Sequence, residues 1–254
     1  LFPSFNTIAG TGENGAIIHY NPDKKTAKKI NQRDIFLCDS GGQYKYGTTD
    51  VTRTICFTKP KNYIKNIFTD FTSLLGDRLY SEDSAIISGF AFLEGAPVLI
   101  LGTEKGHDMN SRIKHNFGMA KPEGYRKSQR IMKLASKLNI PLICFIDTSG
   151  AYPGKDAEER GQAEAIAQSM KVALNCEAPC ISIIIGEGGS GGAIALGTSD
   201  KVLMLSNSIY SVISPEGCSS ILWKSSEYAE IASNSLRVTA QDCLKFKIIT
   251  FKIK

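Results

Sequence analysis

The chain has 254 residues, of which 42% are hydrophobic, and a formal net charge of +5 at pH 7. This length accommodates one large domain or two small ones, and the modest charge makes nucleic acid an unfavoured partner, although a basic surface can attract an anionic coenzyme. A transmembrane helix, a signal peptide, a disulfide framework and a zinc ribbon are all unexpected, because there is no apolar run of ~20 residues, no basic start and no Cys-x-x-Cys among the seven cysteines.

Residues 1–60 form a small β-rich segment in this interpretation. Apolar and β-branched residues predict three strands, at 16–20, 35–38 and 50–57. Asp39 and Asp50 stand at strand edges, where two carboxylates could bridge a pair of metal ions. Asp is also common in turns, so a plain turn role for both stays open.

Four motifs in this segment resemble aminopeptidase P, a dinuclear metallopeptidase of pita-bread fold that removes a residue ahead of proline; they span 4–10, 14–20, 39–44 and 47–54. The resemblance implies that Asp39 and Asp50 match two metal ligands and that His19 matches a substrate-binding histidine. The family also needs a later His and two Glu ligands, and nothing after Pro60 resembles them. We therefore expect the segment to be catalytically inactive.

The sequence changes character after the Lys-Pro-Lys seam at 59–61. Apolar residues at i, i+3, i+4 and i+7 predict a helix over 63–71, with Ile64, Ile67, Phe68 and Phe71 on one face. Two apolar runs joined by the turn 93–96 predict a β-hairpin of 85–92 and 97–103. The polar linker 104–123 is long enough to favour a ligand-covering loop over a plain connection.

The next elements alternate between helix and strand. We expect a helix over 125–138, a buried strand at 141–146 ending in a glycine turn at 147–154, and a helix opened by 158–162. The faces predicted to point inward carry Ile131, Leu134, Ala135 and Leu138 on the first helix, and Ala163, Ile166, Ala167 and Met170 on the second.

A second glycine turn, 186–197, follows a buried strand at 180–185 and leads into a helix. Glycines let the backbone approach a ligand without a Cβ clash, and free N–H groups at a helix start attract negative charge. This pattern predicts stabilisation of an oxyanion by backbone N–H groups. A turn that only packs a helix on a sheet remains the alternative. Both glycine turns end successive strands, so we expect them at one edge of the sheet.

Three known motifs partly match the second glycine turn. The dinucleotide fingerprint lacks its acidic residue after the next strand, and a P-loop lacks its lysine after Gly191. Gly188-x-Ser190-x-Gly192 fits a nucleophile elbow, but all three histidines of the chain lie upstream, whereas an α/β-hydrolase needs one downstream.

The C-terminal part continues the alternation. Strands are expected at 201–205 and 209–213, and Ser214 and Pro215 are suited to cap and start a helix through Trp223. Alternating buried strands and helices define an α/β domain.

Residues 62–250 resemble the carboxyltransferase α subunit of bacterial or plastid acetyl-CoA carboxylase. The motifs that carry the resemblance span 71–78, 116–119, 122–127, 145–154, 157–162, 185–193 and 210–224. The implied fold is the crotonase-like ββα superhelix, with 61–254 as the carboxyltransferase domain. Ser149 stands where the family usually has proline, and 103–108 departs from the family's usual motif.

The implied reaction moves a carboxyl group from carboxybiotin, held on a biotin carboxyl carrier protein, to acetyl-CoA. The product is malonyl-CoA for fatty-acid synthesis. The resemblance implies a β subunit that supplies the acetyl-side anion site and a zinc ribbon, a heterotetramer, and activity only in the assembled complex. It implies a bacterial cytoplasm or a plastid stroma as location. No side-chain base is obligatory for this chemistry.

The resemblance places the biotin-side oxyanion hole at Gly191 and Gly192. We expect cofactor binding by the neighbouring residues Gly188, Gly189, Gly150, Ala151 and Tyr152. A side chain at Gly192 is expected to fill the space where the ureido ring approaches, whereas Ser190→Ala should keep most activity. The alternatives are an Xaa-Pro metallopeptidase fragment fused to a non-functional carboxyltransferase, a serine hydrolase using Ser190, and a folded fusion that assembles with nothing.

Overall fold

The computed structural model describes residues 67–253 without a gap and, before them, six short strands with two single residues, Ala27 and Lys29. The chain divides into two compact units, 1–63 and 64–254. The two family resemblances therefore fall on two separately compact parts of the chain, and each part is described by itself.

Six strands are described in the first unit: β1 (Phe2–Pro3), β2 (Ile8–Thr11), β3 (Ile35–Ser40), β4 (Gly42–Tyr44), β5 (Gly47–Thr48) and β6 (Val51–Cys56). They form two antiparallel sheets, β1-β4-β5 and β2-β3-β6. The strands predicted near 35–38 and 50–57 are confirmed. The backbone of Asp39 pairs with Ile8 and Thr52. The predicted strand at 16–20, His19 and Asp50 lie outside the described residues, and the pita-bread fold stays a prediction.

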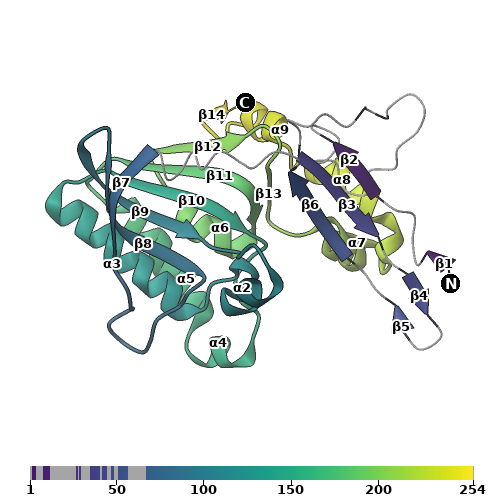
Figure 1. The fold of residues 1–254 in the computed structure, drawn as a ribbon, viewed down its shortest axis with the longest axis horizontal. Coiled ribbons are helices and arrows are strands. Elements are labelled where there is room, and N and C mark those ends of the chain that lie inside the picture. Colours follow the sequence, from purple (N-terminus) through teal and green to yellow (C-terminus); the bar gives the residue numbers. More distant parts are fainter. Residues whose placement is uncertain are drawn as a thin grey trace. The chain divides into compact units, whose positions relative to one another are not determined.

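One mixed sheet organises the second unit (Figure 1), in the order β14-β12-β11-β10-β9-β8-β7. Its strands are β7 (Phe68–Ser73), β8 (Ile86–Leu93), β9 (Ala96–Thr103), β10 (Leu142–Thr148), β11 (Cys180–Gly189), β12 (Lys201–Leu205) and β14 (Phe251–Ile253), while β13 (Ile209–Ser211) pairs with the end of β11. The pairs β7–β8 and β8–β9 are antiparallel, and the other pairs are parallel. The predicted β-hairpin is confirmed.

The helices of this unit are α2 (Met109–Lys114), α3 (Pro122–Leu138), α4 (Lys155–Glu159), α5 (Gln162–Leu174), α6 (Ser190–Gly197), α7 (Pro215–Trp223), α8 (Ala229–Leu236) and α9 (Ala240–Lys245), with 3₁₀ turns at Asn116–Gly118 and Ser226–Tyr228. Helix α3 packs on β8 and β9, α6 packs on β10 and β11, and α5 packs on both helices. None of the described helices is both long and apolar enough to span a bilayer.

The main core lies between the sheet and these helices, where Leu99, Leu101 and Ile131 are fully buried. Alternate residues of the same strands, such as Val98 and Ile100, form a smaller cluster on the opposite face. This alternation follows from the two-residue period of a strand.

The helix predicted over 63–71 is wrong in its described part, because Phe68–Ser73 is strand β7, while residues 63–66 lie outside the described residues. Phe68 pairs with Leu93 of β8, and its ring meets Phe145 edge-on with centroids 6.0 Å apart. Ile67 and Phe71, predicted on the buried face, are 45% and 46% exposed. A short apolar run is compatible with helix or strand, and here pairing with β8 decides the outcome.

The face predicted to be inward on α5 is only partly right, since Ile166 packs against the core and Met170 is half-buried. Ala163 and Ala167 are exposed, whereas Gln162, Ala165 and Ser169 are buried. The buried polar side chains have partners, since Gln162 Nε2 donates to the carbonyls of Ala120 and Tyr152 at 2.9 Å each, and Ser169 Oγ donates to that of Ala165 at 2.9 Å. Hydrogen bonding therefore allows polar residues to take the inward face. On α3, Ile131 and Ala135 are buried as predicted, but Leu138 is exposed.

The segment 104–123 is structured rather than a plain linker. It contains α2, which Asp108 caps by accepting from the backbone N–H of Ser111 at 2.9 Å, and the 3₁₀ turn around Phe117. Helix α3 begins at Pro122, three residues earlier than predicted, with proline in its first turn. The Ser214 cap of α7 is confirmed, because Ser214 Oγ accepts from the N–H of Gly217 at 3.1 Å.

Strand β11 runs to Gly189, beyond the predicted end at 185. Its pairing with β10 is regular as far as Ile146 and Ile184 and then shifts, so that Thr148 pairs with Gly188. Between these two pairs, one residue of β10 thus lies opposite three of β11. The first glycines of the predicted turn are strand residues, and the turn itself is the short step into α6.

Candidate active site at the glycine-rich edge of the sheet

The carboxyl ends of β9, β10 and β11 lie together because these strands are parallel neighbours. The segments 147–154 and 186–192, called the glycine edge below, touch there through their backbones. A Cβ on Gly189 would lie 2.1 Å from the carbonyl oxygen of Ser149, and one on Gly192 would lie 2.6 Å from that of Gly150. The prediction that both glycine segments meet at one edge is confirmed.

Helix α6 presents an uncapped N-terminus at this edge. It starts at Ser190 with Gly189 as N-cap, and no side chain accepts a hydrogen bond from its first turn. The first N–H groups of a helix have no partner within the helix, and they carry the positive end of its dipole. Gly191 and Gly192 hold such N–H groups, so the arrangement is suited to bind a negatively charged oxygen.

The two glycines of this turn have different surroundings. A Cβ on Gly191 would meet only Ile166 of α5, at 3.4 Å, which is an ordinary contact. A Cβ on Gly192 would instead meet the backbone of Gly150 and Ala151 at 2.6–3.0 Å. The structure thus gives a further reason why Gly192 must be glycine, because its missing side chain makes room for the neighbouring turn. The expected role of Gly192 in making room for a ligand stays a prediction.

The turn at 147–154 is held by local hydrogen bonds. Thr148 Oγ1 donates to the carbonyl of Gly150 at 2.8 Å and accepts from its N–H at 3.2 Å. Ala151 bridges to Ala120, and the N–H of Tyr152 donates to the Ala120 carbonyl at 3.0 Å. These bonds fix the turn and attach it to Ala120, just before α3.

A triad of charged side chains, Lys105, Asp147 and Glu187, stands at the ends of the same three strands. Lys105 Nζ lies 2.8 Å from Asp147 Oδ1 and 2.9 Å from Glu187 Oε2. Burial lowers the pKa of Lys105, but the two carboxylates outweigh burial and raise it above its ordinary value. Lys105 therefore stays protonated at neutral pH. This triad, called the lysine triad below, was not predicted from the sequence.

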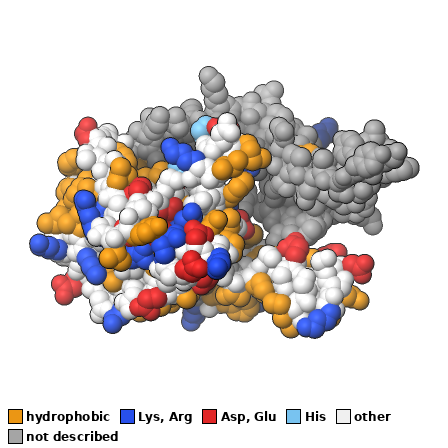
Figure 2. Space-filling model, turned by 90° about the horizontal axis from the view of Figure 1, so that it is seen from below, with side chains coloured by type: hydrophobic (Ala, Val, Ile, Leu, Met, Phe, Trp, Pro, Cys, Tyr) orange, Lys and Arg blue, Asp and Glu red, His pale blue; other side chains and the backbone are white. Residues whose placement is uncertain are grey.

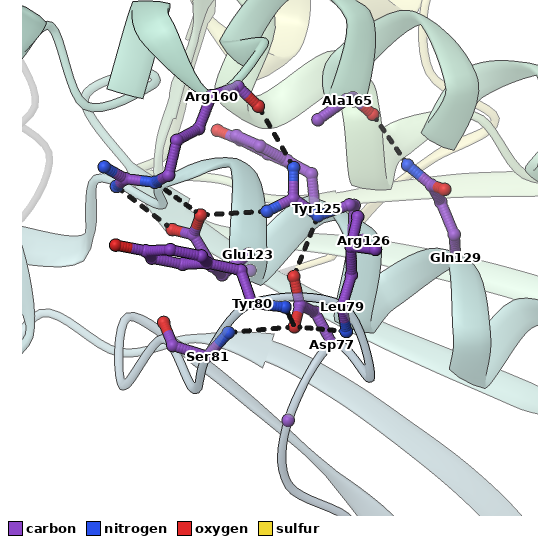
Figure 3. Close-up of polar contacts among 12 residues, drawn as sticks. Asp77, Leu79, Tyr80, Ser81, Glu123, Tyr125, Arg126, Gln129, Arg160 and Ala165 are labelled. Atoms are coloured by element: carbon purple, nitrogen blue, oxygen red, sulfur yellow. Dashed lines mark hydrogen bonds and ion pairs between the residues drawn. The ribbon is translucent and has the colours of Figure 1, made fainter. Parts of the chain in front are cut away.

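A second charged cluster, the arginine network, consists of Asp77, Glu123, Arg126, Asp156 and Arg160, with Glu123 and Arg126 in α3 and Asp156 in α4. Figure 3 shows its members Asp77, Glu123, Arg126 and Arg160. The carboxylate of Glu123 is bound by both guanidinium groups, at 2.9 Å from Arg126 and 2.8 Å from Arg160. Arg126 also binds Asp77 at 2.8 Å, and Arg160 reaches Asp156 at 3.3 Å. Burial raises the pKa of Asp77, but hydrogen bonds from the backbone and from Arg126 outweigh it and lower that pKa.

On the face of the molecule that Figure 2 shows, acidic and basic side chains lie side by side rather than in separate patches of one charge. Sequence reasoning missed the arginine network because its members come from distant positions. Only the motif residues at 122–127 and 157–162 could have drawn attention to it.

Ser190 is exposed and has a φ of +44°, a left-handed value. A strained serine between strand and helix is also a property of a nucleophile elbow. The two histidines in the described part of the chain have other partners, since His107 contacts Asp108 at 3.1 Å and His115 Nδ1 lies 2.5 Å from the Ser84 carbonyl. The structure therefore gives Ser190 no histidine base among the described residues.

The sheet and its helices match solved carboxyltransferases. Transcarboxylase 12S superimposes with a TM-score of 0.65 at 16% identity, over 75% of this chain and 37% of that one. The β subunit of Pseudomonas aeruginosa geranyl-CoA carboxylase gives 0.62 at 16%, over 78% of this chain and 38% of that one. The second unit thus has the crotonase-like fold of the carboxyltransferases.

Residues 44–254 match the acetyl co-enzyme A carboxylase carboxyltransferase-like family, and the chain belongs to that family. It is 60% identical over 187 residues to the acetyl-coenzyme A carboxylase carboxyl transferase subunit alpha of Paramagnetospirillum magneticum, covering 74% of this chain and 59% of that protein. With the subunit of Pelagibacter ubique the identity is 54% over 202 residues, covering 80% and 55%. The chain thus spans little more than half the length of these relatives.

Residues 1–73 match metallopeptidase family M24. This match and the carboxyltransferase-like match overlap over 44–73. The predicted seam at 59–61 lies inside the overlap.

Proposed function

We propose that the chain is an acetyl-CoA carboxylase carboxyltransferase of α type, which takes part in moving a carboxyl group from carboxybiotin to acetyl-CoA. The observation that carries the proposal is the uncapped start of α6 against the 147–154 turn. Family membership supports the assignment of that site to carboxyl transfer. The metallopeptidase and serine hydrolase alternatives are not favoured.

The glycine edge fits an anionic group because its donors are backbone N–H groups in a close-packed, Cβ-free turn. We assign Gly191 and Gly192 to the oxyanion hole, and Gly188, Gly189, Gly150, Ala151 and Tyr152 to the walls of the cofactor site. Bound carboxybiotin would supply the carboxyl group. The role of the chain is to hold negative charge at the N–H groups of α6, which demands no side-chain base.

We propose that a β subunit completes the site with a second anion hole and carries the zinc, and that a biotin carboxyl carrier protein delivers the cofactor. A heterotetramer in a bacterial cytoplasm suits the bacterial relatives and the free cysteines of the described residues. For residues 1–60 we propose an inactive peptidase-like segment, with the carboxyltransferase domain at 61–254.

The test is malonyl-CoA formation by the purified chain with carboxylated carrier protein, with and without a β subunit from a relative. We expect no transfer by the isolated chain and transfer by the complex. The β subunit with carrier protein but without this chain is the control. Full activity of the isolated chain would contradict the two-subunit proposal, and a correctly assembled but inactive complex would contradict the function.

A further inference from the structure

The lysine triad joins the ends of three strands at one point. Lys105 follows β9, Asp147 lies in β10, and Glu187 lies in β11. Asp147 Oδ1 accepts from the Lys105 ammonium at 2.8 Å and from the backbone N–H of Glu187 at 2.9 Å. The N–H of Asp147 donates to Thr103 Oγ1 of β9 at 2.6 Å. Gly150 is three positions after Asp147, and Ser190 is three positions after Glu187, so the two carboxylates of the triad lie one in each segment of the glycine edge.

Two glycines show how closely the backbone is packed around these side chains. A Cβ on Gly186 would lie 2.5 Å from Asp147 Oδ1, and one on Gly118 would lie 2.6 Å from Lys105 Cγ. Gly118 ends the Asn116–Gly118 turn, which the sequence suggested as part of a ligand-covering loop. The Lys105 stem thus packs on that turn while its ammonium binds β10 and β11.

We infer that Lys105 is a positioning residue, which fixes the Asn116–Gly118 turn and the step from β11 into α6 in one arrangement. The expected effect of Lys105 on carboxyl transfer rests on the proposed function. Its expected effect on the arrangement of these two segments does not. The lysine side chain is 29% exposed and those of Asp147 and Glu187 are 33% and 40% exposed, so the triad is open to solvent but tied to backbone on each side.

Charge explains why this role needs a cation. Without Lys105, two carboxylates face the same point, and their repulsion separates β10 from β11 where α6 begins. Because the pKa of Lys105 in the folded chain is raised, its stabilising effect is fully present at neutral pH and is lost as the pH rises through that raised value.

The test compares Lys105→Met with the double variant Lys105→Met/Glu187→Gln by hydrogen exchange and mass spectrometry on the full chain. We expect the protection of amides in 116–119 and 186–192 to fall about tenfold in Lys105→Met at pH 8. Removing one of the two carboxylate charges should restore this protection in the double variant. Lys201→Met, at the opposite end of the same sheet, is the matched control and should change nothing in these segments.

Carboxyl transfer by the complex with a β subunit gives the second readout. We expect kcat of Lys105→Met to fall ~10²-fold at pH 8, with KM for acetyl-CoA within about twofold, because positioning affects the reacting geometry more than substrate binding. Lys105→Gln keeps a hydrogen-bond donor and replaces Lys105→Met in both tests if the latter does not fold.

Unchanged protection in Lys105→Met at pH 8 would overturn the inference, as would a loss of protection that is equally large in the double variant. A higher KM with unchanged kcat would also overturn it, since Lys105 would then bind substrate. If the exchange results are as expected but the wild-type complex transfers no carboxyl group, the proposed function fails and the positioning role stands.

Discussion

The lysine triad and the arginine network are both clusters of ion pairs, but they differ in burial and in what they connect. The carboxylates of Asp77 and Glu123 in the network are 1% and 2% exposed, whereas those of the triad are open to solvent. The network joins α3 and the residues around α4 to the segment before β8 (Figure 3). The triad instead joins the strand ends that carry them.

This difference separates two uses of charge. A deeply buried carboxylate with two guanidinium partners is costly to remove, because both cations lose their counter-charge. Exposed pairs contribute little to stability, but they can still select one arrangement of the backbone to which they are tied. We therefore expect the arginine network to govern folding and the lysine triad to govern the geometry of the site.

Glu123→Ala should have the largest effect on stability. Removing the shared carboxylate leaves Arg126 and Arg160 facing each other, and the melting temperature should fall by roughly 10 °C. The matched control is Glu159→Ala, which breaks the exposed pair with Lys155 at 3.4 Å and should change the melting temperature by less than about 2 °C. Equal shifts in the two variants would contradict the assignment of the network to folding.

Gly192→Ala tests the glycine edge and should have the next largest effect. Its Cβ would meet the Gly150 backbone at 2.6 Å, so the two turns must separate. We expect a loss of roughly 5 °C in melting temperature and a ~10²-fold fall in kcat of the complex. Gly191→Ala is the control, because its Cβ would meet only Ile166 at an ordinary distance. Gly191→Ala should keep the melting temperature of the wild type. A larger fall in melting temperature in Gly191→Ala than in Gly192→Ala would contradict the different surroundings of the two glycines.

Ser190→Ala should have the smallest effect, because the side chain is exposed and the proposed chemistry uses backbone N–H groups. We expect kcat within about threefold of the wild type and a melting temperature within about 2 °C. Ser190→Gly should be somewhat more stable than both the wild type and Ser190→Ala, since glycine adopts the φ of +44° without strain. A folded but inactive Ser190→Ala would restore the serine hydrolase hypothesis.

The glycine edge could be predicted from sequence because its signals are local. Each glycine segment follows a buried strand, and parallel strands end at one edge, so their meeting required no knowledge of distant contacts. What the sequence could not show is which neighbouring atoms lie close to each glycine. That depends on the Gly150 backbone next to Gly192 and on Ile166 next to Gly191.

The parts that could not be predicted depend on tertiary partners. Glu123 and Arg160 are 37 residues apart, and no periodicity relates them. The apolar pattern around Phe68 suits a helix, but β8 offers an edge on which it forms a strand. Gln162 and Ser169 are polar, so a hydrophobic pattern assigns them outward, although their hydrogen bonds keep them buried.

The shift in pairing between β10 and β11 has a consequence for chain length. One residue of β10 lies opposite three of β11 between the pairs Ile146–Ile184 and Thr148–Gly188. A deletion or insertion in this stretch of β11 would move the start of α6 along the strand by ~3.3 Å per residue. The fold therefore tolerates changes of side chain at Ile185 far better than changes in the number of residues. Loops after β11, such as the one between α7 and α8, are the places where length can vary.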